Sequence, residues 1–320
     1  MNNKICEVEF EKWSKIVEEK SQFSIFFKPE YLKSIELCFK LNIKLYALLD
    51  KGNVQFVAAV FCKNRNIVLP EYFSINPYWI DSELSEANQI AIQKEFIQIL
   101  KSEFRNIVIK FNTDVHDLRP FKWTGFDVEL KYTYQKNTFE DVYEKNVSRH
   151  YKKAIEKYKL TAQPCAIDLL NWKSHQVLFK TFYLTQSRVS NIYKWLNILE
   201  EKGLLFTMNI LDDKRLIVGS VVILIDKIKS IGYLLFLESS NNIQSEINAF
   251  LYIEVQKYLL KNGIHVFDYL GANIPSIANY KSRFNPVLKP YYIVTFKKKY
   301  FNFQPLKNII KKYFNTYLIR

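Results

Sequence analysis

The stretch from His265 to Val294, HVFDYLGANIPSIANYKSRFNPVLKPYYIV, decides how the rest of the chain is interpreted. It opens with a predicted buried strand, His265 to Leu270, whose one acidic residue is Asp268. A turn of small residues follows, then a short basic segment with aromatic neighbours, then a second predicted strand, Tyr291 to Phe296. An acid at a strand end, a small-residue turn and a lysine beside aromatic rings form a plausible active-site rim. An ordinary strand, turn and strand has the same pattern, so these residues alone leave both interpretations open.

Length and composition favour a folded protein with a large hydrophobic core. The chain has 320 residues, enough for two domains, and 48% of them are hydrophobic. No apolar run approaches the roughly 18 residues of a membrane-spanning helix. The N-terminal sequence MNNKICEVEFEKW lacks the apolar core of a signal peptide, so we expect a cytoplasmic location.

The spacing of cysteine, histidine and glycine excludes several classes of site. The four cysteines and four histidines are scattered without metal-ligand spacing, so we expect no metal and reduced thiols. Only seven glycines occur, and the closest two are Gly263 and Gly271. That spacing excludes a dinucleotide-binding loop, a Walker-type phosphate loop and a GxSxG nucleophile turn. No tightly bound cofactor is expected.

The net charge of +14 is concentrated near the C-terminus. Residues 269–320 hold ten Lys or Arg and no Asp or Glu, which leaves 36 basic and 32 acidic residues in 1–268. This excess suggests an anionic partner such as nucleic acid, a phosphorylated substrate or a membrane surface. A solvated basic face is the alternative.

The predicted order of elements occurs twice. Each half is predicted as helix, helix, hairpin, strand, helix, strand, strand, although sequence identity between the halves is negligible. The hairpins are expected at 44–62 and 204–225, and a further strand at 66–73. Long helices are expected at 83–104, at 139–158 with Thr138 as a possible cap, and at 245–261, with two shorter ones at about 168–182 and 191–202. We therefore predict two copies of one α/β unit, each a mixed, mostly antiparallel sheet flanked by helices. The expected domains are 1–136 and 137–320, and helix 139–158 could bridge them.

The last sixteen residues, PLKNIIKKYFNTYLIR, form a predicted amphipathic helix, 305–320. Its apolar side chains share one face, and its lysines lie off that face. This pattern is typical of a helix at a membrane interface, which would give peripheral contact at the inner face of the cell membrane. A helix that docks onto its own domain has the same pattern.

Three segments resemble FemABX-like peptidyltransferases, a tandem-GNAT family. DYLGA at 268–272, followed by IANYK at 277–281 and Phe284, resembles that family's "fDf-G … FK-x-F" stretch. NVSRHYKKAIEK at 146–157 resembles its "R-x-x-I-x-K-A" helix, and FYLTQSR at 182–188 resembles its "fy-x-x-T-x-x-R" segment. The match covers about 139–296, and the tandem architecture fits the repeat along the whole chain.

The resemblance implies transfer of an acyl or aminoacyl group onto an amine of a cell-envelope or surface-polysaccharide precursor. FemABX enzymes use aminoacyl-tRNA as donor, whereas ordinary GNAT enzymes use acyl-CoA and hold its pyrophosphate in a Gly-rich loop. The corresponding stretch here, LESSNNIQSEINAFL at 237–251, has no glycine and no arginine. Side chains there would crowd the close approach that glycine permits, although helix N-terminal amides could still hold phosphate. The absence of glycine from this stretch favours aminoacyl-tRNA as the donor. Acyl-CoA is the alternative donor, and a non-catalytic scaffold that binds anionic lipid or nucleic acid is the alternative of another class.

The family motif implies a functional lysine at Lys281, which would stabilise negative charge on a phosphate or on the developing oxyanion. Asp268 and Glu238, at two strand ends, are candidates for positioning the amine or accepting its proton. A solvated lysine and a turn-capping acid are the structural alternatives.

The remaining candidates are binding residues. Arg188 has a guanidinium suited to an anionic acceptor group, with Tyr193 as its companion. Further substrate contacts are predicted at three positions around the turn: Tyr269, Asn273 and Tyr280. A basic row on helix 139–158 could follow an RNA backbone: Arg149, Lys153 and Lys157. A salt bridge within the domain and a solvated helix face are the corresponding alternatives.

Overall fold

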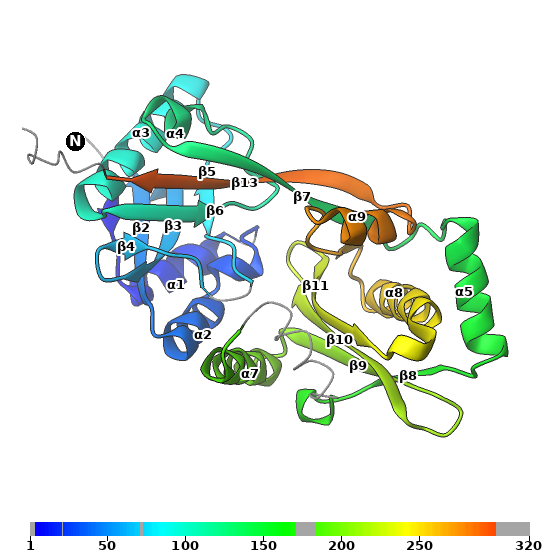
Figure 1. Ribbon diagram of the computed structural model, residues 1–320. Helices are drawn as coiled ribbons and strands as arrows, with labels where there is room; N and C mark the ends of the chain where they lie inside the picture. The colour runs from blue at the N-terminus through cyan, green and yellow to red at the C-terminus, as the bar shows by residue number, and fades with distance from the viewer. Residues whose placement is uncertain (1–3, 21, 71–72, 171–183, 299–320) are drawn as a thin grey trace, which may run out of the picture.

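The computed structural model describes residues 4–20, 22–70, 73–170 and 184–298 (Figure 1). The first half contains β1 (Cys6–Glu7), α1 (Phe10–Glu19), the 3-10 helix η1 (Ile25–Phe27), α2 (Pro29–Phe39), β2 (Asn42–Asp50), β3 (Asn53–Lys63), β4 (Asn66–Ile67), β5 (Tyr78–Ile80), α3 (Glu86–Glu103), β6 (Asn106–Lys110), α4 (Arg119–Trp123) and β7 (Asp127–Asn137). The second half contains α5 (Lys145–Glu156), β8 (Thr161–Pro164), η2 (Ile167–Leu169), α7 (Gln186–Glu201), β9 (Leu205–Leu211), β10 (Ile217–Asp226), β11 (Ile231–Ser239), η3 (Asn241–Ile243), α8 (Gln244–Lys261), β12 (Val266–Asp268), α9 (Pro275–Ser282) and β13 (Val287–Lys297).

The strands of both halves form one continuous sheet. Its order is β1-β2-β3-β4-β6-β13-β7-β12-β11-β10-β9-β8, with β5 paired to β3 beside this path. Most neighbours are antiparallel, and the β11–β12 and β4–β6 pairs are parallel. The predicted fold class, a mixed α/β sheet flanked by helices in two similar halves, is confirmed.

The two halves exchange their last strands at the centre of this sheet. β13, from the second half, pairs with β6 of the first half, and β7, from the first half, pairs with β12 of the second. β7 and β13 also pair with each other, and Figure 1 shows them running side by side across the molecule. The domain boundary expected at residue 136 stays a prediction. A cut there would separate β13 from β6, the strand with which it pairs.

The central pairings repeat with a constant offset of 160 residues. Asn106 pairs with Lys297. Val266, which is 160 residues after Asn106, pairs with Asn137, which is 160 residues before Lys297. The same offset relates the starts of α3 and α8, which read SEAN at 85–88 and SEIN at 245–248. The structure therefore aligns two halves whose sequences alone show no clear identity.

Helices α1, α2 and α7 pack together in a hydrophobic core that both halves share. Trp195 of α7 is fully buried and contacts the rings of Tyr31 and Phe39 of α2, at centroid distances of 6.3 and 5.9 Å. Two further cores lie on other faces of the sheet, one beneath α3 and α4 and one beneath α5 and α8. The shared core and the exchanged strands join the halves by two independent sets of contacts.

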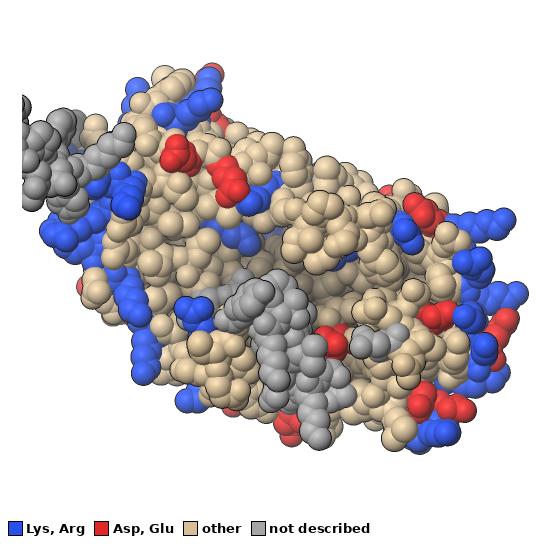
Figure 2. Space-filling model, viewed as in Figure 1, with Lys and Arg blue, Asp and Glu red and all other residues tan. Residues whose placement is uncertain are grey.

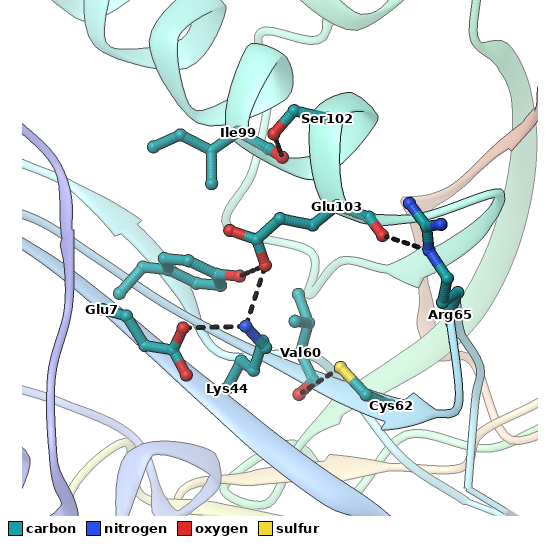
Figure 3. Close-up of polar contacts among 9 residues, drawn as sticks. Glu7, Lys44, Val60, Cys62, Arg65, Ile99, Ser102 and Glu103 are labelled. Atoms are coloured by element: carbon teal, nitrogen blue, oxygen red, sulfur yellow. Dashed lines mark hydrogen bonds and ion pairs between the residues drawn. The ribbon is translucent and has the colours of Figure 1, made fainter.

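An ion-pair network holds the C-terminal end of α3 to the outer strands (Figure 3). The Lys44 ammonium on β2 donates to Glu7 of β1 at 2.8 Å and to Glu103 of α3 at 2.9 Å. The Tyr46 hydroxyl donates to the same Glu103 carboxylate at 3.2 Å. Partly exposed ion pairs contribute at most about 1 kcal/mol each, so this network orients α3 more than it stabilises the fold.

Both predicted hairpins are present. β2 and β3 are joined by Lys51 and Gly52, whose φ angles of 49° and 86° are the two positive values of a type I′ turn.

The predicted helix at 191–202 begins earlier, at Gln186, because the Thr185 hydroxyl caps it by accepting from the Arg188 amide. The predicted helix 305–320 lies outside the described residues, as does most of a helix expected at 168–182.

Three expectations were wrong in detail. A strand expected at 66–73 is limited to Asn66–Ile67. The helix expected from 139 starts at Lys145, because the Thr138 hydroxyl donates to the Ile264 carbonyl and so does not cap it. The segment between the last two strands forms a helix, α9, that was not predicted. No helix in the described ranges is long and apolar enough to cross a membrane.

Candidate active site

A cavity of about 870 Å³ lies where the two halves meet, at the carboxyl ends of β11 and β12. These parallel strands pair only between Ile231–Tyr233 and Val266–Asp268, and β11 then continues to Ser239 beside β10 alone. The cavity occupies the resulting gap, and the surface is hollowed between the halves in Figure 2. Carboxyl ends of diverging parallel strands are a common place for ligand binding in α/β sheets.

Asp268, at the end of β12, is held by donors from the other half. Its carboxylate accepts from the Thr133 hydroxyl at 2.5 Å and from the Gln135 amide at 2.9 Å, both on β7, and from the Leu270 backbone amide at 2.9 Å. Burial raises the pKa of Asp268, and these hydrogen bonds partly oppose the shift. The acid is fixed in place with its oxygens occupied, which suits positioning better than proton transfer.

Lys281, in the last turn of α9, closes the turn after β12. Its ammonium donates to the carbonyl oxygens of Tyr269 at 2.7 Å, of Leu270, and of Gly271 at 3.4 Å. Leu270 and Gly271 both have φ of 52°, the left-handed backbone that brings these carbonyls onto one cation. Burial lowers the pKa of Lys281 to about 8, opposed by the Asp268 charge. Lys281 and Asp268 both line the cavity, and their roles in catalysis stay predictions.

Lys110, which was not predicted, enters the same cavity from the end of β6. Its ammonium lies 5.1 Å from the ring centroids of both Phe73 and Tyr291. Burial lowers the pKa of Lys110 to about 8, and the Asp268 charge opposes that shift. Asn76 fixes its backbone, because the Lys110 amide donates to the Asn76 side chain at 3.0 Å and its carbonyl accepts from the Asn76 amide at 2.9 Å.

Glu238 faces the cavity from the end of β11. It is half-buried, and burial raises the pKa of its carboxyl group. Beside it, the first turn of α8 lines the cavity with Gln244, Ser245 and Asn248. The Asn248 side-chain oxygen is buried and has no hydrogen-bond partner in the described part of the chain. Glu238 is thus the cavity carboxylate best suited to accept a proton.

No family model and no curated protein matches the chain. Solved structures do match over nearly its full length. FemX superposes with a TM-score of 0.65 at 14% identity, covering 96% of this chain and 99% of FemX. L-PGS from Bacillus licheniformis has a TM-score of 0.55 at 11% identity, covering 97% of each chain. A tandem GNAT protein from the clavulanic acid biosynthesis pathway has a TM-score of 0.56 at 8% identity, covering 92% of this chain and 98% of that protein.

The chain has a FemABX-like, tandem-GNAT fold. At these identities the similarity shows the fold alone. The cavity lies between the two GNAT-like halves, and its charged groups come from both of them. In the described parts of the halves, no group of three His, Cys, Asp or Glu side chains could hold a metal ion.

Three predicted contacts lie around the turn after β12 of the second GNAT-like half. Tyr269 is buried and lines the cavity, and its hydroxyl has no hydrogen-bond partner among the described residues. Tyr280 is half-buried with its ring 5.5 Å from that of Phe284. The Asn273 side chain accepts from the Tyr132 amide at 2.8 Å and donates to the Tyr132 carbonyl at 3.0 Å. Asn273 thereby holds the turn to β7, and its role in substrate binding stays a prediction.

The structure does not bring the other predicted residues to the cavity. Arg188 and Tyr193 lie on α7, which packs against α2, and neither is among the residues that line it. Arg149 and Lys153 lie on α5, and Lys157 is the residue that follows its last turn. Figure 2 shows many basic side chains at this end of the second half.

Within that group, Lys153 is engaged inside the protein. Its ammonium donates to the Glu246 carboxylate of α8 at 2.6 Å. The binding roles assigned to all five residues of these two helices stay predictions.

Proposed function

We propose that the chain is an acyl- or aminoacyltransferase that forms an amide on an amine acceptor. The observation that supports it best is the cavity at the strand exchange, which combines a half-buried carboxylate, Glu238, with two desolvated ammonium groups, Lys110 and Lys281. Amide formation from an activated ester needs a base for the amine and positive charge near the developing oxyanion. These side chains supply both.

In this scheme, the amine nitrogen of the acceptor attacks the carbonyl carbon of the donor ester. A new C–N bond forms, and the proton lost by the amine moves to Glu238. The C–O bond of the ester then breaks, and the leaving alkoxide oxygen takes up the proton from Glu238. The Lys110 ammonium stabilises the intermediate oxyanion, while Lys281 and Asp268 hold the turn that shapes the cavity.

We favour aminoacyl-tRNA as the donor. The link between β11 and α8 forms a 3-10 turn, Asn241–Ile243, in a stretch without glycine. Side chains at such a link would crowd a pyrophosphate held against the backbone, which weighs against acyl-CoA. The acceptor would be an amine of an anionic cell-envelope precursor, reached at the membrane surface. Flotation with anionic liposomes tests the membrane contact by comparing the full chain with a chain that lacks residues 305–320. We expect the truncated chain to lose liposome binding.

Donor binding tests the proposal directly. The purified chain is titrated with charged tRNA, with the same tRNA uncharged, and with acetyl-CoA, each at two salt concentrations. We expect charged tRNA to bind more tightly than uncharged tRNA, with affinity that falls as salt rises. Saturable binding of acetyl-CoA alone would favour acyl-CoA as donor. Binding of neither donor would favour a non-catalytic scaffold.

Transfer to a lysine-containing peptide tests the chemistry. Glu238→Gln should leave donor affinity unchanged and lower the rate by about 100-fold or more, the usual contribution of a general base. The matched control is Glu201→Gln at the exposed end of α7, which should react at the wild-type rate. An equal rate for Glu238→Gln and Glu201→Gln would remove Glu238 from the mechanism.

A further inference from the structure

A second cavity, of about 300 Å³, lies in the first half at the position that the internal repeat relates to the active-site cavity. It is bounded by α3, by β5 and by the loop at 112–117, which follows β6 as the loop at 269–274 follows β12. Ile75 and Asn112 line both cavities, so the two are neighbours. The segment before α2, at 22–27, forms the remaining wall.

Two buried polar atoms in this wall have no hydrogen-bond partner within the described protein. The side-chain oxygen of Gln93 on α3 is one, and only 3% of that residue is exposed. The hydroxyl of Tyr78 on β5 is the other. More than nine in ten buried polar groups are hydrogen-bonded in folded proteins, so a pair of such atoms on one cavity indicates a site for hydrogen-bonding groups. An amide oxygen can only accept, and its partner must therefore be a donor.

The charges and rings around these atoms define the kind of donor. Asp114 and Asp117 line the cavity, together with one basic residue, Lys229, and the Asp117 carboxylate is ion-paired with Arg119 at 2.9 Å. Phe23 and Trp79 form an aromatic wall, packed edge to face at 5.3 Å. The Asp114 carboxylate and the ring faces attract cations, whereas an anionic ligand would meet that carboxylate and an acceptor oxygen.

We propose that this cavity binds a small molecule with a primary ammonium group on an apolar body. The ammonium donates to the Gln93 side-chain oxygen and to the Tyr78 hydroxyl, and the apolar body lies against Phe23 and Trp79. A volume of about 300 Å³ is at the lower end of the range for ligand pockets, which suits a ligand the size of an amino acid or smaller. The site does not depend on the transferase chemistry, since none of the proposed catalytic side chains lines it.

Two probes of similar size and opposite charge test the proposal: phenethylamine and 3-phenylpropionate. Binding is followed by NMR chemical shifts of the full chain. We expect saturable binding of the amine and no saturable binding of the acid. Equal binding of the two probes, or binding of neither, would overturn the proposal.

Substitutions of Gln93 locate the binding. Gln93→Leu should weaken phenethylamine binding by about tenfold, because a hydrogen bond to a charged group is lost. Gln93→Glu should strengthen it, since a carboxylate replaces the amide oxygen. Gln163→Leu, on the exposed edge strand β8, is the matched control and should bind as wild type. Unchanged affinity in both Gln93 variants would contradict the site.

A third variant keeps the test decisive if substitutions at buried Gln93 impair folding. Asp114 is exposed, so Asp114→Asn should leave the fold intact. It should weaken phenethylamine binding severalfold, because the negative charge is lost, and it should not lower the affinity for 3-phenylpropionate. An unchanged affinity for the amine in a folded Asp114→Asn variant would count against an ammonium ligand.

Discussion

At the scale of single residues, the two cavity lysines differ in what surrounds them. Lys281 donates to three backbone carbonyls of its own turn, whereas Lys110 lies between the rings of Phe73 and Tyr291. A cation already bonded to the backbone mainly holds structure. Lys110 is therefore the better candidate for contact with the reacting carbonyl, although the sequence motif pointed to Lys281.

This difference predicts how the transfer rate depends on pH. Burial lowers the pKa of Lys110 to about 8, so its ammonium is present below that pH and is lost as pH rises through it. We expect the wild-type rate to fall on the alkaline side of about pH 8. In Lys110→Arg the cation persists, because a guanidinium keeps its proton at much higher pH, and the alkaline fall should move upward.

Transfer rates measured between about pH 6.5 and 9.5 check this prediction. Lys281→Arg is the control, because Lys281 has a similarly lowered pKa and a different environment. If the fall in transfer rate moves to higher pH only in Lys110→Arg, the charge needed for transfer belongs to Lys110. A fall that moves only in Lys281→Arg would restore the role that the motif suggested for Lys281.

At the scale of elements, α8 lies unusually close to the sheet, and two glycines permit it. A Cβ added at Gly219 on β10 would lie 2.7 Å from Ile247 of α8 and 3.3 Å from the Glu238 carbonyl oxygen. A Cβ at Gly232 on β11 would lie 2.9 Å from Leu259. Both contacts are closer than atoms normally approach, so Ile247 and Leu259, or the helix that carries them, would have to shift.

We predict that Gly219→Ala lowers the free energy of unfolding by about 1–3 kcal/mol, the usual cost of overpacking a core. It should also lower transfer activity, because the shift would displace Glu238 and the start of α8 at the cavity. Gly203→Ala has open space around its Cβ but a positive φ of 65°, so it serves as a comparison for backbone strain alone. Urea unfolding measures stability. Full activity in a destabilised Gly219→Ala variant would contradict the coupling to the cavity.

The elements also show what the sequence can and cannot predict. The hairpins and the buried helices were predicted because their apolar residues repeat with a clear period. Helix α9 was missed because none of its residues is buried, so it has no apolar stripe to recognise. Lys110 was missed for a different reason. Its place at the cavity depends on the exchange of β7 and β13, which is a long-range pairing that no local pattern encodes.

At the scale of the whole molecule, the two halves are similar in fold but are not independent in structure. The sheet crosses from one to the other through β6, β13, β7 and β12, and the core around Trp195 contains residues of both. The candidate active-site cavity also depends on both halves, because Asp268 from one half is held by Thr133 and Gln135 from the other. Separation of the halves would therefore remove the cavity as well as the shared core.

We therefore predict that the chain unfolds in urea as one cooperative unit. Far-ultraviolet circular dichroism and tryptophan fluorescence should give coincident transitions, since Trp13 and Trp195 both lie in the shared core. A fragment of residues 1–136 should not fold cooperatively alone, because β13 is missing and leaves β6 and β7 with unpaired edges. Mixing it with a fragment of residues 137–320 should restore part of the structure. Two separate transitions, or a stable 1–136 fragment, would instead mean that each half completes its own sheet without the exchange.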